Sequence, residues 1–237
     1  MKVAIIVPFR NRTEQLKIFL RHMHPFLHRQ ELLYQIFVVE QLGIDTFNRG
    51  GLSNIGYVES LKMNKEFDCF IFTDIDLLPE NDHNYYGCPR SPRHMSVAID
   101  TFNYKLPYGI IFGGVGAWYK EDFEKINGYS MAYWGWGGED DDLFYRVHHA
   151  KLKFNRAPVE IGRYKMVKVH HFRSSKPNPI RVELLRNSTQ RMYSDGLNTL
   201  RYKLKNISEL PLYTLVQIEF KKELYFKDGK YIAKVLN

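Results

Sequence analysis

Short apolar runs alternate with amphipathic stretches through the first third of the chain. Residues 2–7, 34–40 and 69–73 are mostly aliphatic or aromatic, which is typical of buried strands. Residues 13 to about 28 repeat apolar side chains at a helical spacing, with Thr13 as the expected cap, and residues 52–64 form a second expected helix. The order strand, helix, strand, helix, strand predicts an α/β fold with a Rossmann-like, mostly parallel twisted sheet flanked by helices.

Polar residues lie beyond each of these three strands, as Arg-Asn-Arg at 10–12, Phe-Asn-Arg at 47–49 and Asp-Ile-Asp at 74–76. Ligands bind beyond the carboxyl ends of strands in such sheets, so we expect the three clusters to meet. If they continue the strand, Asp74 and Asp76 point to the same side. Two such oxygen donors suit Mg²⁺ or Mn²⁺ carrying a diphosphate, although a solvated Asp-x-Asp turn is the simpler alternative.

Residues 134–142 read Trp-Gly-Trp-Gly-Gly-Glu-Asp-Asp-Asp and are the most informative segment. The glycines give the backbone freedom to bend, so a tryptophan here can swing over a bound sugar ring. Three consecutive aspartates repel one another unless something uses them. One of them, held in an apolar pocket, would be a suitable general base, and another can cap the helix that follows.

The second half of the chain is less regular, with an apolar, glycine-interrupted stretch at 108–119 and short strands and loops after Gly162. We find no internal repeat or clear linker and therefore predict one domain over residues 1–237. The formal net charge is +8, but lysine and arginine are scattered, which argues against a nucleic-acid partner.

Two cysteines, Cys69 and Cys88, are either free buried thiols or, in an oxidising compartment, a disulfide. Sequons at Asn11, Asn187 and Asn206 favour secretion only mildly. Met166, His170 and His171 lie close together and can complete a transition-metal site, but such residues are more often structural.

Several segments in this order resemble the β-1,4-galactosyltransferase family, glycosyltransferase family 7, over nearly the whole chain. They are residues 7–12, 47–49, 72–79, 81–84, 112–115, 134–142 and 194–198. The resemblance implies a GT-A fold and an inverting, Mn²⁺-dependent transfer from a UDP-sugar to a terminal N-acetylglucosamine (GlcNAc) of a glycan. It also implies a type II membrane protein with its catalytic domain in the Golgi lumen. No apolar run of 18 residues and no signal peptide occurs, so we expect a trimmed catalytic domain or an anchorless form.

The resemblance also implies roles for individual residues. Asp140 would be the base, with Glu139 beside it at the reaction centre. The residues implied to hold the donor are Pro8, Phe9, Arg10, Arg12, Phe47, Arg49, Asp74, Ile111, Gly114 and Trp136, the last on a mobile loop. Those implied to contact the acceptor are Tyr108, Gly138, Asp141, Arg181, Val182 and Leu185. Asp76 and Met166 would be metal ligands, and Cys69 and Cys88 would form a disulfide.

Two positions depart from the family pattern. The family's metal-binding histidine stands three residues after the methionine, where this chain has Val169. Of the two histidines that follow, we favour His170 as the ligand, because it shares side-chain parity with Met166 on a strand.

At the second position, Ile111 replaces a tyrosine that crowds the 2-position of the donor sugar in galactosyltransferases. An aliphatic residue there resembles the invertebrate N-acetylgalactosaminyltransferases. We therefore expect the donor to be UDP-N-acetylgalactosamine (UDP-GalNAc). The alternatives are a UDP-galactose (UDP-Gal) enzyme, or a sugar-binding pseudoenzyme without turnover, which the Val169 departure would favour.

Overall fold

The computed structural model describes residues 1–63, 66–168, 176–227 and 230–232. Its main sheet is built from eight strands: β1 (Lys2–Phe9), β2 (Leu33–Leu42), β3 (Cys69–Thr73), β5 (Arg93–His94), β7 (Val115–Trp118), β8 (Asn155–Arg156), β10 (Lys203–Glu209) and β11 (Thr214–Glu219). Two small sheets consist of β4 (Leu77–Pro79), β6 (Ala98–Ile99) and β9 (Arg163–Met166), and of β12 (Phe226–Lys227) and β13 (Lys230–Tyr231). The α-helices are α1 (Thr13–Arg29), α2 (Arg49–Lys62), α3 (Lys120–Lys125), α4 (Glu139–His149), α5 (Arg181–Arg186) and α6 (Ser188–Arg191).

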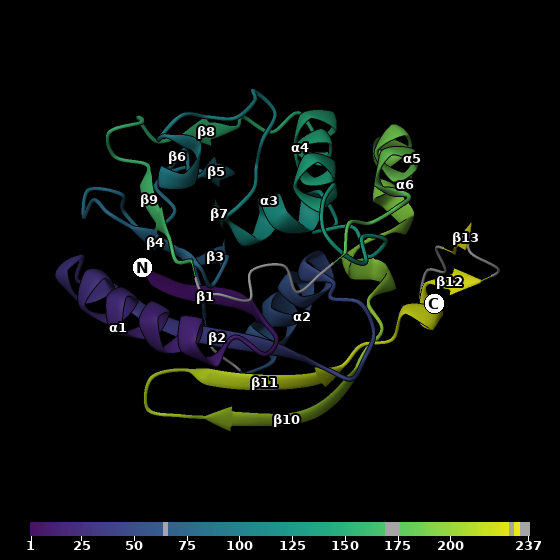
Figure 1. The fold of residues 1–237 in the computed structure, drawn as a ribbon, viewed down its shortest axis with the longest axis horizontal. Helices are drawn as coiled ribbons and strands as arrows, with labels where there is room; N and C mark the ends of the chain where they lie inside the picture. The colour runs from purple at the N-terminus through teal and green to yellow at the C-terminus, as the bar shows by residue number, and fades with distance from the viewer. Residues whose placement is uncertain (64–65, 169–175, 228–229, 233–237) are drawn as a thin grey trace.

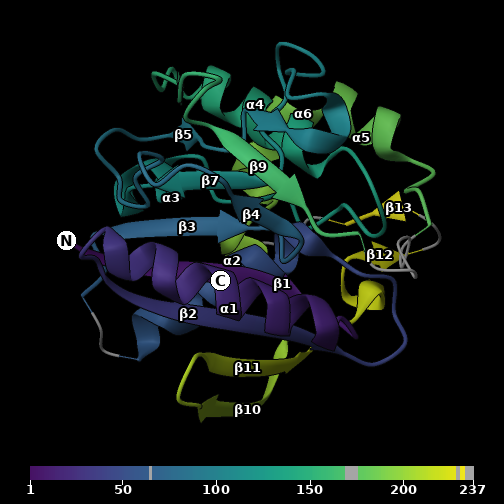
Figure 2. The same cartoon turned by 60° about the vertical axis from the view of Figure 1, so that its left-hand side comes forward.

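Alternating side chains of β1 divide the core into two layers. Val3, Ile5 and Val7 pack with the apolar face of α1, whereas Ala4 and Ile6 pack with α2, α3 and α4. The helices therefore cover both faces of the sheet, as Figures 1 and 2 show. Gly56 lets α2 approach closely, because a Cβ there would lie 2.5 Å from Cγ2 of Ile6.

The sheet is mostly parallel, with two strands, β7 and β10, that run the other way. Its strand order is β10-β11-β2-β1-β3-β7-β5-β8. The centre is parallel, with β11, β2, β1 and β3 running the same way, but β7 pairs antiparallel with both β3 and β5, and β10 pairs antiparallel with β11. β5 and β8 pair in parallel and run in the same direction as the central strands. The predicted mostly parallel sheet is thus confirmed, and the two reversed strands come from the less regular second half of the chain.

The predicted elements are present with shifted ends. The first helix starts at Thr13, but Arg12 is its N-cap and no side chain caps it, so the predicted Thr13 cap is wrong. The second helix begins at Arg49, three residues earlier than predicted, because the Asn48 side chain accepts a hydrogen bond from the Gly51 amide at 2.8 Å.

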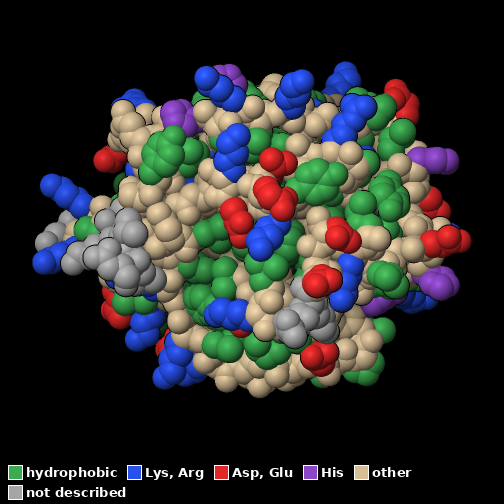
Figure 3. Space-filling view, turned by 180° about the vertical axis from the view of Figure 1, so that it is seen from behind, with side chains coloured by type: hydrophobic (Ala, Val, Ile, Leu, Met, Phe, Trp, Pro, Cys, Tyr) green, Lys and Arg blue, Asp and Glu red, His purple; other side chains and the backbone are tan. Residues whose placement is uncertain are grey.

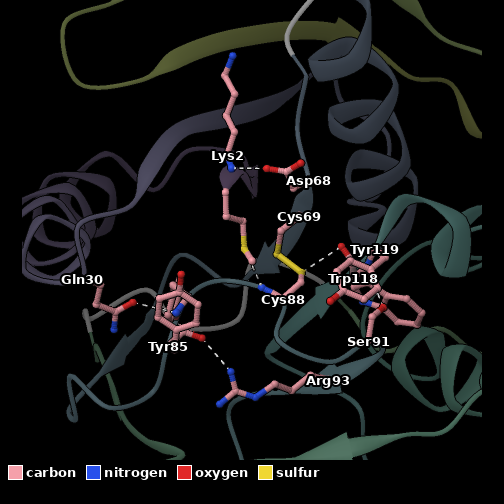
Figure 4. The surroundings of a disulfide bond; sticks show 12 residues. Lys2, Gln30, Asp68, Cys69, Tyr85, Cys88, Ser91, Arg93, Trp118 and Tyr119 are labelled. Atoms are coloured by element: carbon pink, nitrogen blue, oxygen red, sulfur yellow. Dashed lines mark hydrogen bonds between the residues drawn. A yellow bond between two sulfur atoms is a disulfide. The ribbon is translucent and has the colours of Figure 1, made fainter.

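A disulfide joins Cys69 at the start of β3 to Cys88, and both residues are fully buried (Figure 4). Around it, the Cys88 amide donates to the sulfur of Met1 at 3.3 Å, and Arg93 donates to the carbonyl of Tyr85 at 2.8 Å. The oxidised alternative for the two cysteines is confirmed, and the bond anchors the segment that leads from β4 to β5.

Strand β10 forms one border of the main sheet. Lys203, Leu204 and Lys205 are exposed on it, and the pairing with β11 is irregular between Leu204 and Asn206. Over the surface, Figure 3 shows basic side chains spread among acidic ones on one face of the molecule. In the part of the chain that the structure describes, no helix is both long and apolar enough to cross a membrane.

Candidate active site

Arg49 lies at the centre of the candidate site, in the first turn of α2. Its neighbour Asn48 is fully buried and, besides capping the helix, donates its amide to the carbonyl of Met131 at 3.0 Å. Arg49 donates Nε to Oδ1 of Asp74 at 2.5 Å and Nη1 to Oδ1 of Asp140 at 2.7 Å. A third bond runs from Nη2 to the carbonyl of Gly114 at 3.2 Å. One guanidinium thus joins three segments that the sequence analysis selected separately.

The Asp74–Asp76 segment is a turn between β3 and β4, not a strand extension. The Leu77 amide donates to the carbonyl of Asp74 at 3.2 Å and closes this turn. The two carboxylates consequently face different arginines, Asp74 with Arg49 and Asp76 with Arg12, whose Nη1 is 3.1 Å from Oδ2 of Asp76. Our expectation of two carboxylates on one side of a strand is therefore wrong, while their place at the carboxyl end of β3 is confirmed.

The three consecutive aspartates have three different environments. Asp140 pairs with Arg49, and Asp141 accepts a hydrogen bond from the hydroxyl of Tyr108 at 3.0 Å. Asp142 is fully buried and pairs with Arg146 at 2.6 Å. None of them caps α4 through its side chain, since the N-cap is Gly138, so the predicted capping role is wrong. Their position in the first turn still suits the helix dipole.

A cavity of about 200 Å³ opens in front of Asp140. Its lining residues are Tyr108, Trp136, Gly137, Gly138, Glu139, Asp140, Asp141, Arg181, Val182 and Leu185. All six residues predicted to contact the acceptor are among them, together with both reaction-centre acids and Trp136. The Trp136 side chain is 67% exposed, and its backbone bonds with residues 176 and 178 hold the loop beside α5.

Burial and mutual repulsion raise the proton affinity of the acids in this cavity. Removal from water is the largest cause of the raised pKa of Asp140, and Glu139 and Asp74 add to it while Arg49 opposes it. Burial likewise raises the pKa of Glu139. Oε2 of Glu139 is buried without a hydrogen-bond partner in the described part of the chain. A buried polar atom that lines a cavity in this way fits a polar ligand group.

Only part of the predicted metal site falls within the described residues. Asp76 is 8% exposed, and burial, with the charge of Asp74, raises its pKa to about 6 against the opposing effect of Arg12. Leu77 pairs with Met166, and the Val167 amide donates to the Asp76 carbonyl at 2.8 Å, so Asp76 and Met166 lie on adjacent chain segments. Val169, His170 and His171 lie outside the described residues. Within those residues, no three acidic, histidine or cysteine side chains form a metal-sized group.

The predicted donor residues are grouped only in part. Arg10 stacks over Phe47, with 5.3 Å from its guanidinium carbon to the ring centroid, and Phe47 lies two residues before Arg49 in the chain. Pro8 ends β1 with Phe9, whose side chain packs in the core at 6% exposure. Ile111 does not line the cavity, but it lies two residues before Gly113, where a Cβ would meet Oδ2 of Asp140 at 2.7 Å.

Sequence reasoning missed a buried charge network behind the cavity. Asp195, fully buried, accepts hydrogen bonds from the Met131 amide at 2.7 Å and from Arg146 at 3.4 Å, and also pairs with Arg191. Arg191 additionally pairs with Asp142 at 2.8 Å. The 194–198 motif is therefore structural, and the only sequence signal was its resemblance to the family.

Two family models match consecutive parts of the chain. The N-terminal region of glycosyl transferase group 7 matches residues 1–89, and a model described as the N-terminal domain of galactosyltransferase matches residues 93–171. Among curated proteins, β-1,4-galactosyltransferase 2 of Cricetulus griseus is 45% identical over 92% of this chain and 59% of its own length. β-1,4-Galactosyltransferase 1 of Homo sapiens is 46% identical over 92% of this chain and 54% of its own length. The chain thus spans somewhat more than half of these relatives.

A solved structure agrees with the sequence matches. The catalytic domain of Drosophila β-1,4-galactosyltransferase 7, in complex with xylobiose, aligns with a TM-score of 0.78 and 30% identity. The alignment covers 93% of this chain and 94% of that one. A mutant of the same enzyme, solved with manganese, UDP-Gal and xylobiose, aligns equally well. The chain therefore belongs to the β-1,4-galactosyltransferase family, glycosyltransferase family 7, and has its GT-A fold.

Proposed function

We propose that this chain is an inverting, metal-dependent glycosyltransferase that transfers GalNAc from UDP-GalNAc in β-1,4 linkage to a terminal GlcNAc. The observation that carries the proposal is Asp140, a carboxylate of raised pKa held by Arg49 at the wall of the acceptor-sized cavity. Its side chain keeps 25% exposure, so an acceptor hydroxyl can reach it. The relatives named above support glycosyl transfer as the reaction class.

In the proposed reaction, Asp140 removes the proton from the 4-hydroxyl of GlcNAc as that oxygen attacks the anomeric carbon of the donor. The bond from the anomeric carbon to UDP breaks on the opposite face, and its electron pair leaves with the diphosphate. The α-linked donor therefore gives a β-linked product without a covalent intermediate. Arg10, Arg12 and Arg49 would neutralise charge on the leaving diphosphate, and Oε2 of Glu139 would accept a hydrogen bond from a hydroxyl of the acceptor.

Asp76 and Met166, with His170, would hold the Mn²⁺. An oxygen, a thioether and an imidazole suit a divalent transition metal better than Mg²⁺. Asp76 fits the role because it is a buried carboxylate, paired with Arg12. When bound, the ion would stabilise negative charge on the leaving diphosphate.

Removing a ligand should weaken metal binding without unfolding the protein. We expect Asp76→Asn and His170→Ala each to raise the dissociation constant for Mn²⁺ by about 10- to 100-fold. The measurement is the free Mn²⁺ signal in an electron paramagnetic resonance titration, which does not depend on turnover. His171→Ala is the matched control. If it weakens binding and His170→Ala does not, the assignment of the histidine is wrong.

Donor choice rests on Ile111. The N-acetyl group at carbon 2 of GalNAc needs space that a tyrosine at this position would occupy. Isoleucine is shorter, offers no hydroxyl and leaves an apolar surface for the acetyl methyl group. A clash in a packed site costs about 1–3 kcal/mol, whereas a buried methyl contributes about 0.8 kcal/mol, so relief of the clash dominates.

We therefore expect the protein to use UDP-GalNAc at least as well as UDP-Gal, and Ile111→Tyr to shift the preference toward UDP-Gal by roughly tenfold. The measurement is kcat/KM for both donors with a GlcNAc acceptor. Ile110→Tyr, the same change one residue earlier, is the control and should alter the ratio much less. A wild-type protein that strongly prefers UDP-Gal would favour the galactosyltransferase alternative, to which the names of the relatives point.

We further propose that the full-length protein is membrane-anchored with this domain in the Golgi lumen. The disulfide supports an oxidising compartment, since such bonds are rare in the cytosol. A pseudoenzyme is distinguished from an enzyme by metal-dependent hydrolysis of the UDP-sugar in the absence of acceptor. A binder would show affinity for the nucleotide sugar but release no UDP.

A further inference from the structure

A buried histidine on β5 contacts the backbone of the segment that carries Ile111. His94 is fully buried, and its Nε2 lies 2.9 Å from the carbonyl of Gly113. Its Nδ1 lies 3.3 Å from Nε of Arg156 on the paired strand β8. Arg156 has only donors, so Nδ1 must accept, and Nε2 must carry the hydrogen that is donated to Gly113.

Arg156 extends this contact to the other end of the same segment. Its Nη2 donates to the carbonyls of Gly109 and Ile111, each at 2.8 Å. Arg156 and His94 therefore hold three carbonyls within residues 109–113, which form neither helix nor strand, and the hydroxyl of Ser96 also donates to the Gly113 carbonyl at 2.9 Å. Hydrogen bonds from a charged donor are stronger than those from a neutral donor. Because residues 109–113 have no regular backbone hydrogen bonds of a helix or strand, the bonds from Arg156 are the strongest that fix their position.

Residues 109–113 connect two parts of the candidate site, the cavity wall at Tyr108 and the Asp140–Arg49 pair. The segment follows Tyr108, which lines the cavity and donates to Asp141, and it ends against Asp140 at Gly113. The next residue, Gly114, accepts from Arg49 and has a φ of +83°, where a Cβ would meet the hydroxyl of Ser96 at 2.5 Å. A shift of residues 109–113 would therefore move Ile111 and disturb the space around Asp140 together.

Neither Arg156 nor His94 lines the cavity or pairs with the site acids. They also have no place in the reaction proposed above. Burial, with the charge of Arg156, lowers the pKa of His94 to about 3, so the ring stays neutral and its two hydrogen bonds keep their direction at physiological pH. Its ring also stacks on Phe112, with centroids 5.6 Å apart, which fixes its orientation.

We propose that Arg156 and His94 are positioning residues that set donor choice by fixing the backbone of residues 109–113. The inference rests on the proposed function, because it deepens the role given to Ile111. It predicts that the preference between UDP-GalNAc and UDP-Gal depends on two side chains that do not line the cavity.

The test compares Arg156→Gln and Arg156→Lys with Arg93→Gln. Arg93 is the matched control, since it lies on the neighbouring strand β5 but donates to Tyr85 and Asn84 instead. Glutamine is too short to reach both carbonyls and His94, and we expect donor kcat/KM to fall about 10- to 100-fold. The ratio between the two donors should move toward one by about threefold or more. Lysine should recover part of the loss, and Arg93→Gln should leave the ratio unchanged.

Hydrogen–deuterium exchange of the same variants separates this inference from the proposed function. Exchange should rise in peptides that cover residues 108–114 and remain unchanged in β1 and β3. Unchanged exchange in 108–114, a rise throughout the sheet, or an unchanged donor ratio despite local exchange would each overturn the inference. If the wild-type protein transfers no sugar at all, the proposed function fails, and exchange alone decides whether Arg156 holds the segment.

Discussion

Asp140→Asn should lower turnover by about 10² to 10⁴-fold, the usual contribution of a general base, while UDP and Mn²⁺ still bind. Asparagine keeps the size of the side chain and can still face Arg49, but it cannot take the proton from the acceptor. The measurement is single-turnover transfer at saturating donor and acceptor, with UDP affinity measured by calorimetry as the binding control. Turnover close to wild type would remove Asp140 from the role of base.

The same residue predicts how the rate depends on pH. Burial raises the pKa of Asp140, so its proton is lost at a higher pH than that of an exposed aspartic acid, about 3.9. Because the base must be deprotonated, kcat should fall as pH decreases through the raised pKa and stay constant above it. Asp141→Asn should keep this acidic limb, since Asp141 bonds to Tyr108 and not to Arg49.

Of the substitutions proposed here, Asp195→Asn should lower the free energy of unfolding most. The wild-type carboxylate is fully buried and balances the positive charges of two arginines, Arg146 and Arg191. Arg146 is also fully buried. Removing one member of a buried ionic network costs about 3–5 kcal/mol, because the remaining charges stay buried with less compensation. For a chain of this size, that corresponds to a fall of roughly 6–20 °C in the unfolding temperature.

Thermal unfolding followed by circular dichroism measures this effect. Asp82→Asn is the control: Asp82 pairs with Arg29 on the surface, with 49% of its side chain exposed, so the unfolding temperature should change by no more than about 2 °C. Equal, small shifts in both variants would mean that the network behind the cavity does not hold the two arginines.

The sequence predicted the parallel centre of the fold because its elements are long enough to show a period. β1, β2, α1 and α2 each span eight residues or more, and their apolar positions repeat clearly. In contrast, β5 and β8 have two residues each, too few to define any alternation. Their pairing, parallel with each other and antiparallel between β5 and β7, is decided by tertiary contacts, so this end of the sheet was not predictable from pattern.

In the candidate site, too, residues in local motifs were predictable, and residues placed by tertiary contacts were not. Arg49, Asp74 and Asp140 were selected because each lies in a recognisable motif, and in the structure Arg49 donates hydrogen bonds to both aspartates. Nothing local marks Arg156, which acts on Gly109 and Ile111 from 45 residues or more along the chain. The sequence also could not assign different environments to three adjacent aspartates, since these depend on the helical rotation that sends Asp142 into the core and Asp140 toward the cavity.

Strand β10 has a consequence for how molecules of this protein behave at high concentration. An open sheet border is a template for strand addition, which leads to aggregation. Here the exposed Lys203 and Lys205 place positive charge along the border, and the irregular pairing after Leu204 interrupts its straight hydrogen-bonding line. If two copies approached through β10, their lysines would repel one another, and the irregular strand would not offer a continuous row of hydrogen-bonding groups. Edge-to-edge stacking is therefore disfavoured, and we expect the protein to stay dispersed at high concentration.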